Sequence, residues 1–281
     1  MNDLPTLMQL STSPEAAGTG LVQRPAVVPG AAQVAPARGA IEVTWARHLD
    51  EVRQAQRLRF EVFAAEMGAR LTTPVPGHDV DLFDDYCEHL LVRDAQSLQV
   101  IGTYRVLTPA QAQRVGGTYS DTEFDLTRLR SLRPRMVELG RSCVHPDHRH
   151  GGVIMALWTA LGEFMVRNNL DTMIGCASIP MMQGGVFNGD VAASIWRQVR
   201  EKYMAPIEFQ VRPRLALPLD NLNDRLPVEP PALIKGYLRA GAWICGEPAW
   251  DPDFNTADLP VLLPVSRLDA RYAKHFMGRK D

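Results

Sequence analysis

The stretch from Met136 to Trp158 reads MVELGRSCVHPDHRHGGVIMALW, and it decides the fold that we expect for this chain. Apolar residues, among them Val137 and Val144, predict a strand, which Pro146 then ends. Beyond the turn, apolar residues recur at helical spacing, at Ile154, Leu157, Leu161 and Met165. The stretch therefore predicts a strand, a turn rich in His and Gly, and a helix.

Two opposite charges, Glu138 and Arg141, fall within the predicted strand. Strict alternation would send them to opposite faces of the sheet. Gly140 lies between them, and a glycine inside a strand often marks a bulge. A bulge would bring both charges to one side and leave backbone N–H groups unpaired, which are two ingredients of an acyl-transfer site. The alternative is an ion pair on an edge strand.

The composition excludes several classes of protein. The net charge of −2 argues against a general nucleic-acid binder, and hydrophobic residues make up an ordinary 46% of the 281 residues. No apolar run approaches the roughly 18–20 residues that a membrane span needs, and the first residues make a poor signal peptide. The four cysteines are scattered at Cys87, Cys143, Cys176 and Cys245, as expected for reduced thiols in a cytoplasmic protein.

The chain divides into a tail and one domain. Residues 1–40 are rich in Ala, Pro and Gly and contain no aromatic residue, so they cannot bury enough apolar surface to offset their ordering entropy. We expect a disordered tail there. Residues 41–281 are expected to form a single domain with an insertion at about 177–229.

Strands and helices mix along this domain. The patterns predict strands over residues 41–45, 87–92, 99–107, 136–144, 171–176, 242–247 and 259–265, and helices over residues 48–67, 152–165, 191–203 and 231–240. This order indicates an α/β (α+β) fold with a mixed central sheet flanked by helices.

Two charged clusters each have two interpretations. Four acids in the loop 71–86, namely Asp79, Asp81, Asp84 and Asp85, form either a solvated face or a loop anchored against a cleft by the apolar residues between them. Four arginines lie close together before the strand 136–144, at Arg128, Arg130, Arg133 and Arg135. They form either a solvated segment or a basic patch suited to an acidic protein or a phosphate. For His145, His148 and His150 we expect no metal, because no Cys or Glu ligand is near.

The element order, with a bulged fourth strand before a turn and helix, resembles the GNAT acyltransferase fold. That family's turn, Q/R-x-x-G-x-G/A, holds the pyrophosphate of coenzyme A at a helix N-terminus. Here the turn from Arg149 to Ile154 keeps the first Arg of this pattern, and Gly151 and Gly152 supply its glycine. At the last position, where the family has a small residue, this chain has Ile154. The resemblance thus implies donor-binding roles for these residues. The Ile favours acyl carrier protein, with its single-phosphate 4′-phosphopantetheine, and no resident cofactor is expected.

Isolated residues also resemble the set shared by acyl-homoserine lactone synthases, which are GNAT-fold enzymes. They are Arg59-x3-Phe63, Asp81-x2-Asp84, Arg105 and Glu138-x2-Arg141, although the tryptophan that usually follows Arg-x3-Phe is absent. Longer segments, FDDYCEHLLV, VELGRSCVHPDHR and IKGYLRAGAWICGEPAWDPDFNTADLPVLL, instead resemble ornithine N-acyltransferases. The resemblance covers about Ile41 to the C-terminus, and the GEPAWDPDFNTAD segment is its most specific part.

This resemblance implies transfer of a 3-hydroxyacyl group from acyl carrier protein to the α-amine of L-ornithine, giving lyso-ornithine lipid. Glu138 would be the base, with Arg141 orienting it or binding the substrate carboxylate. N–H groups near Cys143 and Val144 would polarise the thioester carbonyl, and Asp81 or Asp84 would bind ornithine's second ammonium. Arg59, Phe63 and Arg105 complete the expected substrate site, and the basic patch would dock the carrier.

Two other functions remain open at this point. One is a lactone synthase that uses S-adenosylmethionine, and the other is a non-catalytic module that binds acyl carrier protein. Because the product of an ornithine acyltransferase is a lipid, transient contact with the inner membrane surface is compatible with the sequence. The Met-containing segment Ile179–Phe187 could supply this contact, with core packing as the alternative use of its methionines.

Overall fold

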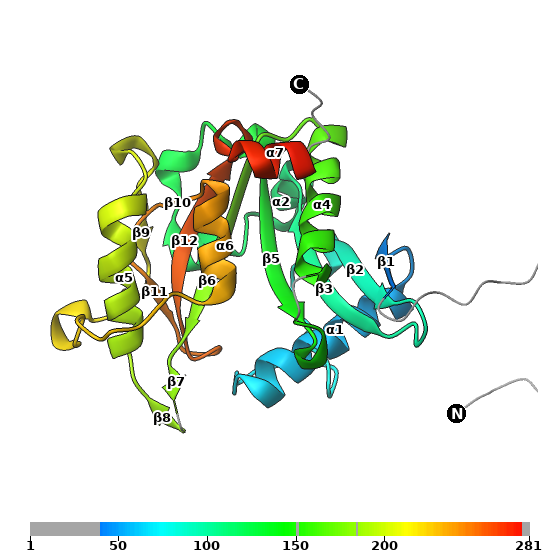
Figure 1. Cartoon of the computed structure of the whole chain (residues 1–281), viewed down its shortest axis with the longest axis horizontal. Helices are drawn as coiled ribbons and strands as arrows, with labels where there is room; N and C mark the ends of the chain where they lie inside the picture. Colours follow the sequence, from blue (N-terminus) through cyan, green and yellow to red (C-terminus); the bar gives the residue numbers. More distant parts are fainter. Residues whose placement is uncertain (1–39, 150–151, 184, 277–281) are drawn as a thin grey trace, which may run out of the picture. The chain divides into compact units, whose positions relative to one another are not determined.

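The computed structural model describes residues 40–149, 152–183 and 185–276 (Figure 1). The tail predicted over residues 1–40 falls almost entirely outside these ranges, so its disorder stays a prediction. All described residues belong to one compact unit.

The described residues form an alternation of strands and helices that follows the predicted order closely. The strands are β1 (Ile41–Trp45), β2 (Glu88–Asp94), β3 (Val100–Leu107), β4 (Phe124–Asp125), β5 (Met136–Val144), β6 (Thr172–Pro180), β7 (Met182–Gln183), β8 (Val186–Phe187), β9 (Arg212–Pro213), β10 (Trp243–Ile244), β11 (Ala249–Asp251) and β12 (Thr256–Pro264). The helices are α1 (Leu49–Phe60), α2 (Pro109–Val115), α3 (Ser120–Glu123), α4 (Gly152–Arg167), α5 (Asp190–Tyr203), α6 (Ala232–Ala240) and α7 (Ala270–Phe276).

One mixed sheet organises these elements. Its strands run in the order β1-β2-β3-β5-β6-β12-β10, with β11 paired to β12. The pair β5–β6 is parallel, and the other pairs in this order are antiparallel. The predicted GNAT-like α/β (α+β) architecture is confirmed, and β5 is the fourth strand of this sheet along the chain.

The strands β5 and β6 separate after a short paired region. Only Met136–Glu138 of β5 pair with Thr172–Ile174 of β6. Gly175 follows at the point of separation, where a Cβ atom would lie 2.4 Å from the carbonyl oxygen of Leu139, so no larger residue fits there. Figure 1 shows the two strands close together near α7 and diverging towards their C-terminal ends.

The predicted bulge is present in β5. Thr103 of β3 faces Cys143, and Arg105 faces Gly140, so that Arg141 and Ser142 together oppose a single residue of β3. Arg141 has a φ of 51°, a left-handed conformation that costs a non-glycine residue roughly 1–2 kcal/mol. Gly140 therefore stands beside the bulge, and Arg141 itself adopts the unusual backbone conformation.

The sheet is covered on both faces. Helix α1 packs through Ala55 and Leu58 against Leu91 of β2, whereas α4 packs on the other face against Leu90 and Ile101. Helices α5 and α6 enclose a further core over β6 and β12. Because side chains alternate along β3 and both faces of the sheet are covered, all eight residues of this strand are buried.

The structure differs from the expected elements in several places. The helix predicted over residues 48–67 is α-helical only to Phe60 and continues as a π-helix over Glu61–Glu66. Strand β6 extends to Pro180 because it pairs with β12 along its whole length, so it takes up the start of the expected insertion at 177–229. The short elements α2, α3, β11 and α7 were not predicted. Among the described residues, no helix is long and apolar enough to cross a membrane.

Candidate active site

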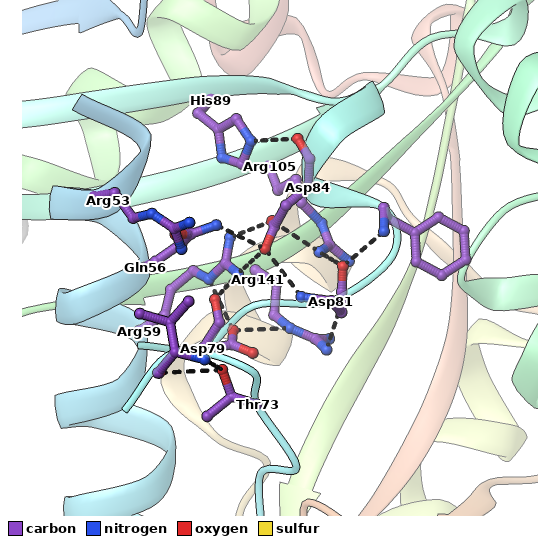
Figure 2. A network of polar contacts seen from close by, with 12 residues as sticks. Arg53, Gln56, Arg59, Thr73, Asp79, Asp81, Asp84, His89, Arg105 and Arg141 are labelled. Carbon is purple, nitrogen blue, oxygen red and sulfur yellow. Dashed lines mark hydrogen bonds and ion pairs between the residues drawn. The ribbon is translucent and has the colours of Figure 1, made fainter. Parts of the chain in front are cut away.

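A network of buried charges joins the acid loop to three arginines (Figure 2). Arg59 of α1 is fully buried, and its Nε donates to Asp79 at 2.8 Å. Its two other nitrogens donate to the two carboxylate oxygens of Asp84, each at 2.8 Å. This fork geometry fixes the loop 79–84 against α1 and gives charge-assisted hydrogen bonds at both ends.

Two further arginines complete the network from β3 and β5. Arg105 donates to Asp81 at 2.5 Å and to Asp84 at 3.2 Å. Arg141 donates to Asp79 at 3.1 Å and to Asp81 at 3.0 Å. The residues expected to form the substrate site at Arg59, Asp81, Asp84, Arg105 and Arg141 are thus brought together, and Asp79 joins them.

The network neutralises itself, because three arginines face three aspartates. Burial alone would raise the pKa of Asp84, but the charge of Arg59 and its hydrogen bonds hold that pKa well below its usual range. Asp81 behaves similarly, since burial is outweighed by the charges of Arg105 and Arg141 and its pKa is lowered. Both carboxylates therefore stay ionised and already have cationic partners. Their predicted contact with an ammonium group stays a prediction.

Arg141 is held between aromatic rings as well as by its ion pairs. Its guanidinium carbon lies 4.9 Å from the centroid of the Tyr119 ring and 4.5 Å from that of Phe254. Phe63 of the Arg-x3-Phe motif meets Phe254 edge to face, with 5.8 Å between ring centroids. The structure thus places Phe63 in the support of Arg141 and explains how a left-handed arginine is tolerated in β5.

Glu138 is buried at the point where β5 and β6 separate, and its carboxylate is fixed by backbone groups. One oxygen accepts from the N–H of Ser120 at 2.6 Å, and the other accepts from the N–H of Tyr119 at 2.8 Å. Burial raises the pKa of Glu138, and the hydrogen bonds from Ser120 and Tyr119 offset part of that effect. A carboxylate with a raised pKa in a fixed position suits proton transfer.

A second group of acids, the acid cluster of Glu123, Asp251 and Asp258, lies beside Glu138 and Arg141. Tyr119 connects the two regions, because its hydroxyl donates to Asp251 at 3.0 Å while its ring faces Arg141. Burial followed by the charges of Asp258 and Asp251 raises the pKa of Glu123 to about 7. Burial and the charge of Asp251 raise the pKa of Asp258 to about 6. Within the described part of the chain, these three carboxylates form no ion pair.

An apolar cavity lies beside the separation of β5 and β6, under helices α4 and α6. It is lined by Tyr104, Leu139, Trp158, Leu161, Gly162, Met173, Ile174, Gly175, Cys176, Ala177, Tyr237, Ala240, Val261, Leu263 and Leu268. Cys176 lines the cavity, and its thiol donates to the hydroxyl of Ser120, whose N–H donates to Glu138. Asp258 pairs with Ser178, two residues beyond Cys176 on β6. The cavity and the acid cluster therefore meet near Cys176.

The thiols of the site are not activated for nucleophilic attack. Burial raises the pKa of Cys143 to about 12, so its thiolate is scarce at neutral pH. Cys143 and Val144 lie on β5 just past the bulge, paired with Thr103 and Gly102 of β3. Their expected role as the site of N–H donors to the thioester carbonyl stays a prediction.

The four arginines expected to form a basic patch differ in their contacts. Arg133 binds Asp121 with both terminal nitrogens, and Arg135 contacts Asn169 and Asp171. Arg128 donates to the carbonyl oxygen of Ile207, while Arg130 is exposed. Two of the four positive charges are thus already compensated.

The donor-binding turn is described only in part. Arg149 makes a two-pronged ion pair with Glu66, with both N–O distances at 2.7 Å, and its Nε donates to the carbonyl oxygen of Val144. Gly152 is exposed at the start of α4, and Gly151 lies outside the described residues. The turn is therefore anchored to the end of the π-helix beside β5.

Sequence reasoning did not single out Tyr119, Ser120 or Glu123, which precede the short strand β4. Their contacts reach residues 18 to 132 positions away, and no local pattern reports such a distance. Asp251 and Asp258 had a signal, because both fall in the segment GEPAWDPDFNTAD that carries the resemblance to the ornithine enzymes.

Fold and site together define a GNAT-type acyltransferase. A family model described as an acetyltransferase (GNAT) domain matches residues 58–159. The crystal structure of the AHL synthase LasI is similar with a TM-score of 0.50 over 85% of this chain and 94% of that chain, at 12% identity, a level that shows the fold alone.

The curated relatives narrow this class. The L-ornithine N(alpha)-acyltransferase of Brucella abortus (strain 2308) is 34% identical over 258 residues, which are 85% of this chain and 89% of that protein. Proteins of the same name from Agrobacterium fabrum (35% over 260 residues; 86% and 87%) and Rhizobium meliloti (34% over 275 residues; 90% and 90%) are similar to the same extent. The chain belongs to the L-ornithine N(alpha)-acyltransferase family, as the sequence predicted.

Proposed function

We propose that this protein transfers a 3-hydroxyacyl group from the phosphopantetheine thioester of acyl carrier protein to the α-amine of L-ornithine, the first step in making an ornithine lipid. One observation carries the assignment of the site. At the separation of β5 and β6, an apolar cavity lies next to the fixed carboxylate of Glu138, and Asp258 of the acid cluster pairs with Ser178, two residues beyond the cavity residue Cys176. The family relationship favours ornithine over the alternatives of a lactone synthase and a non-catalytic module.

The acyl chain occupies the apolar cavity in this proposal. The thioester carbonyl then lies at the bulge of β5, where backbone N–H groups near Cys143 and Val144 polarise it. Leu139 lines the cavity while the adjacent Glu138 is held by the loop before β4, since neighbouring strand residues point to opposite faces. The acyl chain and the base thus approach the same short piece of β5 from two sides.

Glu138 acts as the base, directly or through water. The α-ammonium of ornithine gives a proton to this carboxylate, and the free amine attacks the thioester carbon. The C–N bond forms and the C–S bond breaks, the second proton of the attacking nitrogen goes to the carrier thiolate, and Glu138 releases the first proton to solvent. Because burial raises the pKa of Glu138, its proton affinity is closer to that of an amine than an exposed glutamate's would be.

The acid cluster binds the second ammonium of ornithine. Its three carboxylates have no cationic ion-pair partner among the described residues, and burial together with their mutual repulsion raises the pKa values of Glu123 and Asp258. A bound ammonium would relieve this repulsion. By contrast, Asp81 and Asp84 share three arginines already, so we assign them, with Arg59 and Arg105, to holding Arg141 in place.

Arg141 binds the substrate and takes no part in the proton transfer. Its guanidinium is shared between two aspartates and two aromatic rings, and it faces the region between Glu138 and the acid cluster. In this position it attracts the carboxylate of ornithine. The positive Arg141 then binds the carboxylate of ornithine, and the negative acid cluster binds its side-chain ammonium.

Acyl carrier protein is the proposed donor because the turn before α4 has Ile154 where the family's pyrophosphate loop has a small residue. Arg149, Gly151 and Gly152 would meet the phosphopantetheine. Among the four arginines before β5, Arg128 and Arg130 are exposed and form no ion pair within the described ranges, so they are the stronger candidates for docking the acidic carrier. Arg133 and Arg135 would contribute less.

A membrane surface is the proposed place of product release, beside a cytoplasmic site of synthesis. The segment Ile179–Phe187 splits in two, because Met181 is fully buried while Met182, Val186 and Phe187 are exposed in β7 and β8. These exposed apolar side chains are suited to shallow contact with lipid.

The test is mass spectrometry of a reaction that contains the purified protein, 3-hydroxytetradecanoyl carrier protein and L-ornithine. The expected product is the amide on the α-amine, formed together with free carrier thiol. Free 3-hydroxytetradecanoic acid with no amide, or an acylated lactone formed only when S-adenosylmethionine is present, would overturn the proposal.

A further inference from the structure

Two tyrosines bring a pair of hydroxyl groups into the largely apolar wall of the cavity. Tyr104 of β3 and Tyr237 of α6 both line it, and their hydroxyl groups hydrogen-bond to each other. Tyr104 is 2% exposed, so this contact lies in the interior. Buried tyrosines usually do find a partner, but two of them meeting inside an apolar cavity place polar atoms where an acyl chain would run.

The hydroxyl pair extends to the bulge of β5. The side chain of Ser142 hydrogen-bonds with Tyr104, and Ser142 is one of the two bulged residues. The three hydroxyls therefore form a chain from the bulge into the cavity. A thioester whose carbonyl lies at the bulge would pass the first carbons of its acyl group along this chain.

The hydroxyl chain has capacity for one more partner. Three hydroxyl groups carry three donor protons, and the two bonds that join them use two. Burial raises the pKa of Tyr104, and burial with the neighbouring Tyr104 raises that of Tyr237, so both phenols stay protonated at neutral pH. The remaining proton and the free lone pairs can bind a ligand hydroxyl as donor or acceptor.

The orientation of Tyr237 is fixed independently of this contact. Its ring stacks on Trp158 of α4 with 5.6 Å between centroids and 16° between planes. Gly236 makes this possible, because a Cβ atom there would lie 2.8 Å from the indole of Trp158. A phenol held by stacking keeps its hydroxyl in the cavity whether or not a ligand is present, which is a requirement for a selective site.

We propose that the hydroxyl chain Ser142–Tyr104–Tyr237 recognises the hydroxyl group on the third carbon of the acyl donor and selects 3-hydroxyacyl over plain acyl thioesters. The inference rests on the proposed function, since it assumes an acyl chain in the cavity. A plain chain leaves the hydroxyls without a ligand partner, whereas a 3-hydroxyl restores a hydrogen bond in a dry site. Sites that hydrogen-bond a substrate hydroxyl discriminate better than apolar pockets do.

The experiment compares two donors of equal length, 3-hydroxytetradecanoyl and tetradecanoyl carrier protein, with ornithine as acceptor. The wild type is expected to favour the hydroxylated donor in kcat/KM. In Tyr237→Phe and in Tyr104→Phe this preference should fall about tenfold, the scale of one neutral hydrogen bond, while kcat/KM for the plain donor stays the same or rises. Because Phe keeps the ring, the stacking on Trp158 is retained.

Tyr203→Phe is the matched control, since it removes the hydroxyl of a tyrosine on α5 that does not line the cavity. It should alter both donors equally and leave the preference unchanged. An equal preference in wild type and in both Tyr variants, with amide formed from each donor, would overturn the inference and leave the proposed function intact. Failure to form amide from either donor with folded wild type would instead overturn the proposed function.

Discussion

Two groups of carboxylates are linked to Arg141, one by direct ion pairs and the other through Tyr119, and they differ in how their charge is balanced. Asp79, Asp81 and Asp84 are saturated by three arginines in a closed network. Glu123, Asp251 and Asp258 form no ion pair with any described residue, and burial with their mutual repulsion raises the pKa values of Glu123 and Asp258. The aspartates of the neutralised network hold the structure together, whereas the acid cluster has an excess of negative charge that suits the binding of a cation.

The sequence indicated that Asp81 and Asp84 belong to the site, but it did not indicate that they pair with arginines. The Arg-x3-Phe and Asp-x2-Asp motifs correctly indicated that these residues act together. The motifs carry no information on the arginine partners, because Arg59, Arg105 and Arg141 come from three different elements. Only the fold shows that the acids expected to meet a substrate are already paired.

The largest expected effect is on the closed network. Asp84→Asn removes a buried charge that three arginine hydrogen bonds share, and it should lower the free energy of unfolding by about 3–5 kcal/mol, because an arginine is left uncompensated in the interior. Urea denaturation followed by circular dichroism measures this. The neighbouring Asp85 is exposed, so Asp85→Asn is the control and should change stability little. Equal stability of both variants would show that the network is not structural.

The second prediction concerns Glu138, whose carboxylate belongs to neither group and accepts from the N–H groups of Tyr119 and Ser120. Glu138→Gln should lower turnover by about 10²–10⁴-fold, the usual scale for general acid–base catalysis. The amide also places an NH₂ group opposite one of the N–H donors of Tyr119 and Ser120, so a modest loss of stability is expected. Steady-state kinetics on protein verified as folded is the measurement. Turnover within a few-fold of wild type would remove Glu138 from the mechanism.

A third prediction lies outside both groups and concerns docking of the carrier. Reversal of Arg128 and Arg130 to Glu should raise KM for the carrier about tenfold and spare kcat, and the effect should shrink at high salt. Arg135, which already contacts Asp171, offers the control: Arg135→Glu should act more weakly. The donors to compare at two ionic strengths are the carrier and coenzyme A thioesters of one acyl group. Equal kcat/KM for the two donors, without salt dependence, would contradict carrier use.

The smallest expected effect is on the pH dependence of stability, which should differ between the arginine–aspartate network and the acid cluster. Asp84 has a lowered pKa, so its contribution to stability is present above about pH 4 and lost below it. Asp258 and Glu123 ionise in the folded protein at about 6 and about 7, against ordinary values of 3.8 and 4.5, so their protonation favours folding and this gain is lost as pH rises towards 7. The melting temperature should therefore fall from pH 5 towards pH 7.5, and also below pH 4. In Asp258→Asn the upper slope should flatten, and an unchanged slope would argue against these shifts.

The strand, turn and helix around β5 could be predicted because their signals are local. Periodicity marks α4, Pro146 marks the end of β5, and Gly140 marks the neighbourhood of the bulge. The acid cluster could not be assembled in this way, since Glu123 meets Asp251 and Asp258 only after the chain has passed through β5, β6 and α6. Likewise, Tyr104 and Tyr237 are 133 residues apart, and nothing in either sequence context indicates the other.

The most direct test of the account measures selectivity for the side-chain amine of the acceptor. The kcat/KM values for L-ornithine and for norvaline, which is ornithine without that amine, are compared in wild type, Asp258→Asn and Asp85→Asn, each checked for its melting temperature. Wild type and Asp85→Asn should favour ornithine strongly. Asp258→Asn should lose about 10–100-fold of that preference, the scale of a hydrogen bond to a charged group, and keep its rate with norvaline. The same preference for ornithine in folded Asp258→Asn as in wild type would contradict the assignment of the acid cluster.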